Sequence, residues 1–98
     1  MRDPKVLKEV KATLALLAEL SPGRAIEVRI PPYAAIQCGD GPTHTRGTPP
    51  NVIEMSADTW LALASGHLLW AEAVAAGSIN ASGVRADLTS FLPLKIVK

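Results

Sequence analysis

The chain has 98 residues, a formal net charge of +1 and one cysteine. That length predicts a single domain over residues 1–98, in which any ligand cavity competes with the hydrophobic core for the same apolar side chains. The small net charge, without a clustered basic face, argues against nucleic-acid binding, and one cysteine excludes an internal disulfide and a multi-cysteine metal site.

The location of the protein is predicted from two further features. The amino terminus begins with charged residues and lacks the apolar core of a signal peptide. No run approaches the roughly 18 apolar residues that a membrane span requires. We therefore expect a cytoplasmic protein with no transmembrane segment, which leaves room for transient contact with a membrane.

The first predicted element is a helix that begins at Asp3 and Pro4, an N-cap acceptor followed by a proline suited to the first turn. Apolar residues then recur at helical spacing, at Val6, Val10, Leu14 and Leu17. Ser21-Pro22-Gly23 is expected to end the helix. The apolar stripe favours packing on a sheet, and a membrane-surface helix is the alternative.

Residues 26–30 alternate between apolar and charged side chains and predict a half-buried strand. Because two-residue hairpins generally need positive φ angles, which proline cannot adopt, we place the following hairpin turn at Asp40-Gly41 rather than at 31–32. This hairpin pairs residues whose numbers sum to 81, so the strand at 51–55 runs antiparallel to 26–30 and Glu27 lies opposite Glu54. Apolar residues continue on the first strand's inner face at Ala34, Ile36 and Cys38.

The remaining elements fall between residues 56 and 94. Ser56 is a good N-cap and Gly66 a natural helix stop, which predicts a helix between them. Further short helices are predicted at 68–76 and 84–92, with a strand at 78–82 between them. The polar stretch 43–48 is either a solvated hairpin arm or a site for an anion or a lipid head group.

Catalytic chemistry is not indicated anywhere in the chain. His44 and His67 lack the spacing of metal ligands, and Cys38 lies on the apolar face of a predicted strand with no neighbour in sequence that would activate it. We therefore expect no metal, no cofactor and no enzymatic activity. Trp60 and Trp70 either fill the small core or line one wall of a cavity between the helices and the sheet.

Several stretches resemble a known family. Residues 58–83 read DTWLALASGHLLWAEAVAAGSINASG, with further likeness in RIPPYAAIQC at 29–38, HTRGTPPNV at 44–52 and SGVRADL at 82–88. These segments resemble the sterol carrier protein 2 family, and more closely its short bacterial branch. The resemblance implies an α+β fold, with a small and mostly antiparallel sheet, helices packed on one face and an apolar cavity between them.

The resemblance also implies a function and a site. It implies a non-catalytic lipid or sterol carrier that binds an apolar small molecule: a sterol, a fatty acyl chain or a phospholipid. The implied lining residues are Trp60, Leu63, Leu68, Trp70, Val74, Ile79 and Ile36, with a lid helix carrying Leu88, Phe91 and Leu92. The implied polar mouth is His44, Arg46 and Arg85.

Two alternatives stay open. The chain could be a protein-interaction or dimerisation module of the same fold that has lost lipid binding, with the Pro-Pro-marked hairpin arm extending a sheet edge. It would then be a homodimer rather than a monomer, or would bind another partner. An enzyme that uses residues 43–51 together with Arg85 is the third hypothesis.

Overall fold

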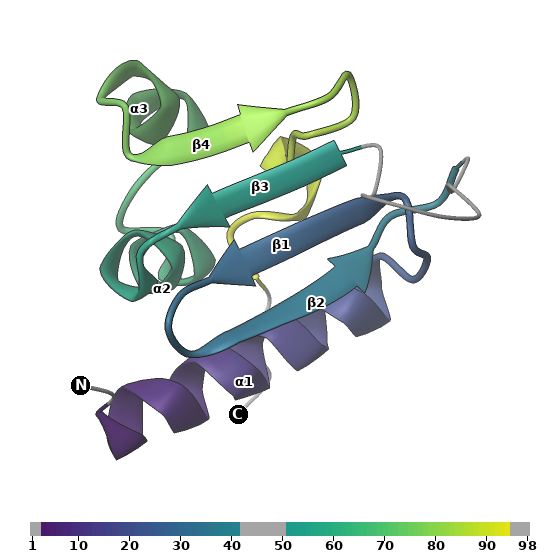
Figure 1. Ribbon diagram of the computed structural model, residues 1–98. Coiled ribbons are helices and arrows are strands. Elements are labelled where there is room, and N and C mark those ends of the chain that lie inside the picture. Colours follow the sequence, from purple (N-terminus) through teal and green to yellow (C-terminus); the bar gives the residue numbers. More distant parts are fainter. Residues whose placement is uncertain (1–2, 42–50, 95–98) are drawn as a thin grey trace.

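The computed structural model describes residues 3–41 and 51–94. The elements are helices α1 (Pro4–Leu20), α2 (Ala57–Ser65) and α3 (Trp70–Ala75), strands β1 (Ile26–Ile30), β2 (Ala34–Cys38), β3 (Asn51–Met55) and β4 (Ile79–Ser82), and a short 3-10 turn, η1 (Thr89–Phe91). Figure 1 shows the four strands side by side in the order β2-β1-β3-β4. The fold is therefore α+β, as the sequence predicts.

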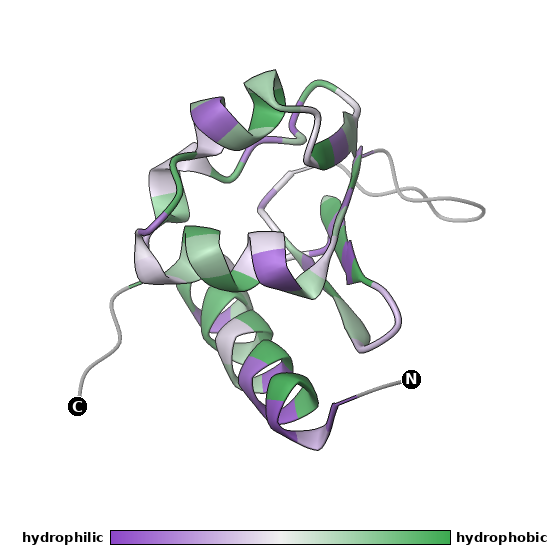
Figure 2. Ribbon diagram, turned by 90° about the vertical axis from the view of Figure 1, so that its left-hand side faces the viewer, coloured by the Kyte–Doolittle hydropathy of each residue, from purple (hydrophilic) through white to green (hydrophobic). Residues whose placement is uncertain are grey.

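The sheet is mixed. Strands β1 and β2 pair antiparallel, as do β3 and β4, whereas the central pair β1 and β3 is parallel. α1 packs on β2 and on α2, and Figure 2 shows the helices gathered on one side of the sheet. The alternating burial of β1 and β3 fits this arrangement, because every second side chain points toward the helices.

The hairpin turn between β1 and β2 lies at Pro31-Pro32, so the turn predicted at Asp40-Gly41 is wrong. The peptide bond between the two prolines is cis, and the Tyr33 N–H donates to the Ile30 carbonyl at 2.8 Å. A turn with a cis-proline in its third position needs no positive φ angle. Two-residue turns with positive φ angles exclude proline, but this turn type does not.

The long hairpin predicted for residues 26–55 is wrong for the same reason. Ile26 pairs with Cys38 at the end of β2 on one side and with Asn51 at the start of β3 on the other. Cys38 and Asn51 thus lie at the same end of the sheet, on either side of Ile26. Because β3 starts at the end where β1 also starts, the two strands run parallel. In this register Glu54 lies opposite Arg29, so the expected clash with Glu27 does not occur.

The predicted helix starts and stops at α1 and α2 are confirmed. The Asp3 carboxylate accepts from the Lys5 N–H at 2.8 Å, and the Ser56 hydroxyl accepts from the Thr59 N–H at 3.2 Å. Gly66 ends α2 with a φ of 87°, a left-handed conformation that suits glycine. The strand β4 also forms as expected, and α3 begins two residues later than predicted.

The helix predicted at 84–92 is wrong. Only η1 is helical in this stretch, and it is followed by Pro93. The Asp87 carboxylate accepts from the Thr89 N–H at 2.8 Å, a local bond that competes with helix formation. The segment instead crosses the helical side of the sheet, and the Leu94 N–H donates to the Ala64 carbonyl of α2 at 3.0 Å.

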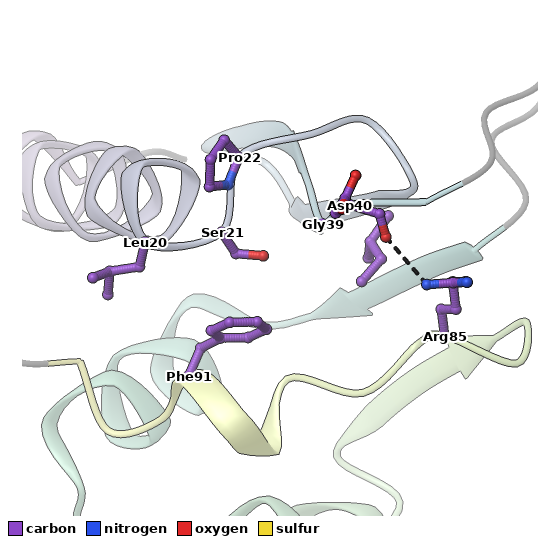
Figure 3. Close-up of a pocket in the computed structure, with 8 residues that line it drawn as sticks. Leu20, Ser21, Pro22, Gly39, Asp40, Arg85 and Phe91 are labelled. Carbon is purple, nitrogen blue, oxygen red and sulfur yellow. Dashed lines mark hydrogen bonds between the residues drawn. The ribbon is translucent and has the colours of Figure 1, made fainter.

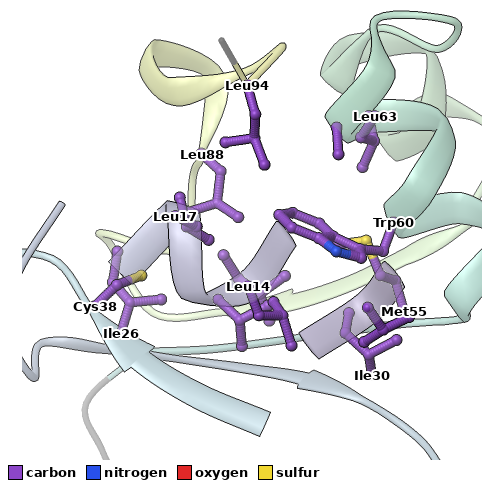
Figure 4. Packing of buried hydrophobic residues seen from close by; sticks show 14 of the residues in the cluster. Leu14, Leu17, Ile26, Ile30, Cys38, Met55, Trp60, Leu63, Leu88 and Leu94 are labelled. Atoms are coloured by element: carbon purple, nitrogen blue, oxygen red, sulfur yellow. The ribbon is translucent and has the colours of Figure 1, made fainter. Parts of the chain in front are cut away.

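The core lies between the sheet and this helical layer. Figure 4 shows Trp60 at its centre, beside Leu14 of α1 and close to Met55 and Ile30 of the sheet. All four side chains are at most 4% exposed. The core also takes side chains from the carboxyl-terminal segment, since Leu88 is fully buried and Leu94 is 6% exposed.

Candidate functional site

Three of the residues predicted to line a cavity are core residues. Trp60 and Leu88 are fully buried, and Leu63 is 1% exposed. The Trp60 indole Nε1 donates to the Thr13 hydroxyl at 2.8 Å, so its polar atom is also satisfied within the protein. These three side chains therefore belong to the hydrophobic core between the helices and the sheet.

Four further predicted lining residues are less buried. Val74 is 49% exposed on α3, and Trp70 at the start of α3 is partly buried. Ile79 on β4 and Ile36 on β2 are also partly buried. Ile36 and Ile79 lie on strands at opposite edges of the sheet, whereas Trp70 and Val74 share one helix.

The described part of the chain contains an open pocket of about 640 Å³. It lies between the end of α1, the end of β2 and the carboxyl-terminal segment (Figure 3). Its lining residues are Leu20, Ser21, Pro22, Ile26, Gly39, Asp40, Arg85 and Phe91. Of these, only Arg85 and Phe91 are among the predicted site residues. The volume is within the range of small-molecule sites.

Close backbone contacts hold the end of α1 against the end of β2. The Gly39 N–H donates to the Ser21 carbonyl at 2.8 Å, and the Gly39 carbonyl accepts from the Ala25 N–H at 3.1 Å. Gly23 makes this approach possible, because a Cβ at that position would lie 1.9 Å from the Gly39 oxygen. The wall formed by residues 20–23 and 39–40 is therefore fixed by backbone hydrogen bonds rather than by mobile side chains.

Arg85 is held at the rim of this pocket by a buried amide. Asn51 is 3% exposed; its Oδ1 accepts from the Arg85 backbone N–H at 2.9 Å and its Nδ2 donates to the Ala25 carbonyl at 2.8 Å. The Arg85 Nη1 donates to the Asp40 carbonyl at 3.1 Å, the dashed line in Figure 3. Within residues 3–41 and 51–94, the only ion pair joins Arg29 and Glu27, so no carboxylate there neutralises Arg85.

Two smaller hollows adjoin the pocket. One, of about 430 Å³, shares Leu20 and Phe91 with it. The other, of about 440 Å³, shares Leu92 and Pro93 with the second and is also lined by Leu68, Leu69 and Trp70. The three hollows follow one another along the carboxyl-terminal segment through these shared residues, and we refer to them together as the trough. It contains Leu68, Trp70, Phe91 and Leu92 of the predicted site.

The remaining predicted mouth residues, His44 and Arg46, lie outside the described residues. The described residues that flank this stretch are close to the pocket: Asp40 lines it, and Asn51 bonds to the Arg85 backbone. Arg85 lines the pocket, and the polar mouth formed with His44 and Arg46 stays a prediction.

The ionisable groups near the core and on α2 offer little chemistry. Burial raises the pKa of the Cys38 thiol to about 11, so the thiol is neutral at physiological pH. The Ser65 hydroxyl contacts His67 Nδ1 at 2.7 Å, and both side chains are exposed at the end of α2. In the described ranges, no three His, Cys, Asp or Glu side chains come close enough to hold a metal ion.

Sequence reasoning missed the α1 side of the pocket, including Leu20 and Pro22. Leu20 is 48% exposed at the last position of α1, where a leucine is ordinarily assigned to the helix's buried stripe. Leu20 follows Leu17 by three residues and so continues the helical spacing of that stripe, and the sequence alone gives no signal that it lines a pocket instead.

Comparison with known proteins gives the family. No helix in the described part of the chain combines the length and apolar character that crossing a bilayer requires. No curated protein matched the sequence. A family model described as "Bacterial SCP ortholog" matches residues 3–94. This match covers almost the whole chain and agrees with the α+β architecture, and the chain therefore belongs to the family of bacterial SCP orthologues.

Proposed function

We propose that this protein is a non-catalytic carrier that binds an apolar or amphipathic small molecule, such as a fatty acyl chain, a sterol or a phospholipid, in the trough along its carboxyl-terminal segment. The observation that carries this proposal is the open pocket of about 640 Å³ between Leu20, Ile26 and Phe91. Membership of a family that is generally made up of carriers supports it.

The proposed site differs in place from the cavity that the family resemblance implies. Trp60, Leu63 and Leu88 pack the interior, so an internal ligand would have to displace core side chains at a cost of several kcal/mol. The trough needs no such rearrangement, because it is already open. The Phe91 ring lines two of the three hollows, as Leu20 does, and offers an aromatic apolar surface to a ligand.

The expected affinity is modest. Burial of about 300 Å² of apolar ligand surface at about 25 cal/mol per Å² is worth roughly 7 kcal/mol. The loss of translational and rotational freedom on association opposes this gain. The result is a dissociation constant on the order of micromolar or weaker, which suits a carrier that must release its ligand.

Mass spectrometry of an organic extract of the purified protein would identify a co-purified ligand, and a fluorescent acyl probe would measure binding directly. We expect Phe91→Ala to weaken probe binding about tenfold, as loss of a well-packed contact does. Val84→Ala is the matched control, because Val84 is fully exposed and should leave binding unchanged. Absence of both an extracted ligand and probe binding would refute the proposal.

A second function is favoured by the β4 edge. β4 is the outermost strand of the sheet; its residues Ile79–Ser82 carry no charge and no proline, and only Ile79 is partly buried. Such an edge is a template for strand addition, and Leu69 and Val74 of the α3 region add exposed apolar surface. We propose a dimerisation or interaction module as the alternative function. Sedimentation of a strict monomer at high concentration would count against the self-association form.

A further inference from the structure

We infer that Arg85 makes the pocket selective for amphiphiles with an anionic head group, a carboxylate or a phosphate, over neutral amphiphiles such as sterols or long-chain alcohols. This inference rests on the proposed function and names its ligand class. The geometry points to a ligand whose charged end lies at Arg85 and whose chain passes Ile26 and Phe91 toward Leu20.

The Arg85 side chain is positioned for this role before any ligand arrives. Its backbone is tied to the buried Asn51 amide, and its Nη1 is tied to the Asp40 carbonyl. A guanidinium carries several N–H donors in one plane, and a single bond to a carbonyl leaves the others available. Pre-positioning lowers the ordering cost of binding, and a planar fork of donors matches the oxygens of a carboxylate or a phosphate.

The acceptor that Arg85 uses is a neutral one. Its partner is the backbone carbonyl of Asp40, and its guanidinium forms no ion pair with any described carboxylate. An arginine in a carboxylate pair would already be neutralised, whereas this one keeps its full charge for a ligand. It stands at one end of a pocket whose other surfaces, at Leu20 and Phe91, are apolar.

The Asp40 carboxylate is the one opposing charge among the residues that line the pocket. It lies beyond ion-pair distance of Arg85, so it does not neutralise the guanidinium directly, but it repels an incoming anion. Removing this charge while keeping the backbone carbonyl should strengthen anion binding. Asp40→Asn and Arg85→Gln therefore have opposite expected effects at the same site, which a general loss of folding cannot imitate.

The test is a set of titrations of the full chain with three ligands of equal chain length: dodecanoate, dodecyl phosphate and dodecanol. We expect the two anionic ligands to bind at least tenfold more tightly than dodecanol. Arg85→Gln should remove this preference by weakening the binding of the two anions at least tenfold. Asp40→Asn should tighten the binding of the two anions severalfold. Arg29→Gln is the control, because Arg29 lies on the face of the sheet that points away from the helices, and it should change nothing.

The possible results separate the two proposals. Equal binding of all three ligands, unaffected by Arg85→Gln, would overturn the selectivity inference and leave the carrier function standing. Binding of none of them would overturn the carrier function itself. Acetate and inorganic phosphate form the last arm: we expect neither to bind at the concentrations used, and binding as tight as that of the long-chain anions would make this a simple anion site and overturn the inference.

Discussion

The indole Nε1 of Trp60 donates a hydrogen bond to the hydroxyl oxygen of Thr13, with 2.8 Å between the two atoms. The Thr13 hydroxyl lies within 2.7 Å of the Glu9 carbonyl of its own helix, to which it donates. The bond joins α2 to α1 at a part-buried position, although the Trp60 side chain itself is fully buried. Trp60 therefore has a structural role, and it orients the two helices that flank the carboxyl-terminal segment.

Thr13→Val should destabilise the protein by about 1 to 3 kcal/mol, since it leaves the buried Trp60 N–H without an acceptor while keeping the side-chain volume. Thr13→Ser is the control, because it keeps the hydroxyl oxygen and loses only a methyl group. Chemical denaturation, monitored by tryptophan fluorescence, gives the free energy of unfolding of each variant. Equal stability of the valine and wild-type proteins would contradict the role assigned to this bond.

Leu88→Ala should cost about 2 to 5 kcal/mol, because Leu88 is fully buried and its truncation leaves a cavity in the core. Val84→Ala, four residues earlier in the same segment, should change stability by less than about 0.5 kcal/mol because Val84 is fully exposed. Thermal unfolding of the two variants compares them directly. A similar melting temperature for both would show that the segment does not anchor in the core.

Gly23→Ala should be strongly destabilising, by about 2 kcal/mol or more. Gly23 has a φ of 138°, and an added Cβ would lie 1.9 Å from the Gly39 oxygen, which already accepts the Ala25 N–H. The neighbouring exposed Arg24 gives a control: Arg24→Ala loses only one surface hydrogen bond, to Gln37. Urea denaturation of both variants checks the difference, and a tolerated alanine at 23 would disprove the close approach.

The Cys38 thiol gives an alkaline pH dependence. Burial raises its pKa from 9.0 to about 11, so the folded protein favours the neutral thiol more than the unfolded chain does. The contribution of the thiol to the free energy of unfolding is therefore fully present below pH 9 and is lost as the pH rises toward 11. We expect the denaturation midpoints of the wild type and of Cys38→Ala to differ by a constant amount below pH 9. The difference should shrink as the pH rises toward 11. A parallel pH course of the two would contradict a buried thiol.

Asn51→Asp should destabilise the protein by about 2 kcal/mol or more, because it replaces the N–H donor that faces the Ala25 carbonyl with an acceptor in a buried site. The loss should be greatest at neutral pH, where the new carboxyl group must be buried in its charged form, and should shrink as the pH falls. Asn51→Gln keeps the amide N–H donor and the carbonyl acceptor. It therefore tests only the distance of the amide from its two backbone partners. Denaturation at pH 5 and pH 7 distinguishes the two effects.

Local signals in the sequence determined most of the elements. Asp3 with Pro4, Ser56 with Gly66, and the alternation over 26–30 each act within a few residues, through hydrogen bonds and side-chain periodicity. The same local patterns carry the family resemblance, and with it the α+β class that the structure shows.

The tertiary structure alone decided what those elements build. The turn at Pro31-Pro32 reverses the chain early, and β3 then pairs parallel to β1. The core then draws in Leu88, and residues 84–94 cross the helices in place of forming one. The pocket brings together residues 20–22, 39–40, 85 and 91, which lie far apart in sequence. No local pattern specifies such contacts, because they depend on how the whole chain fills one small core.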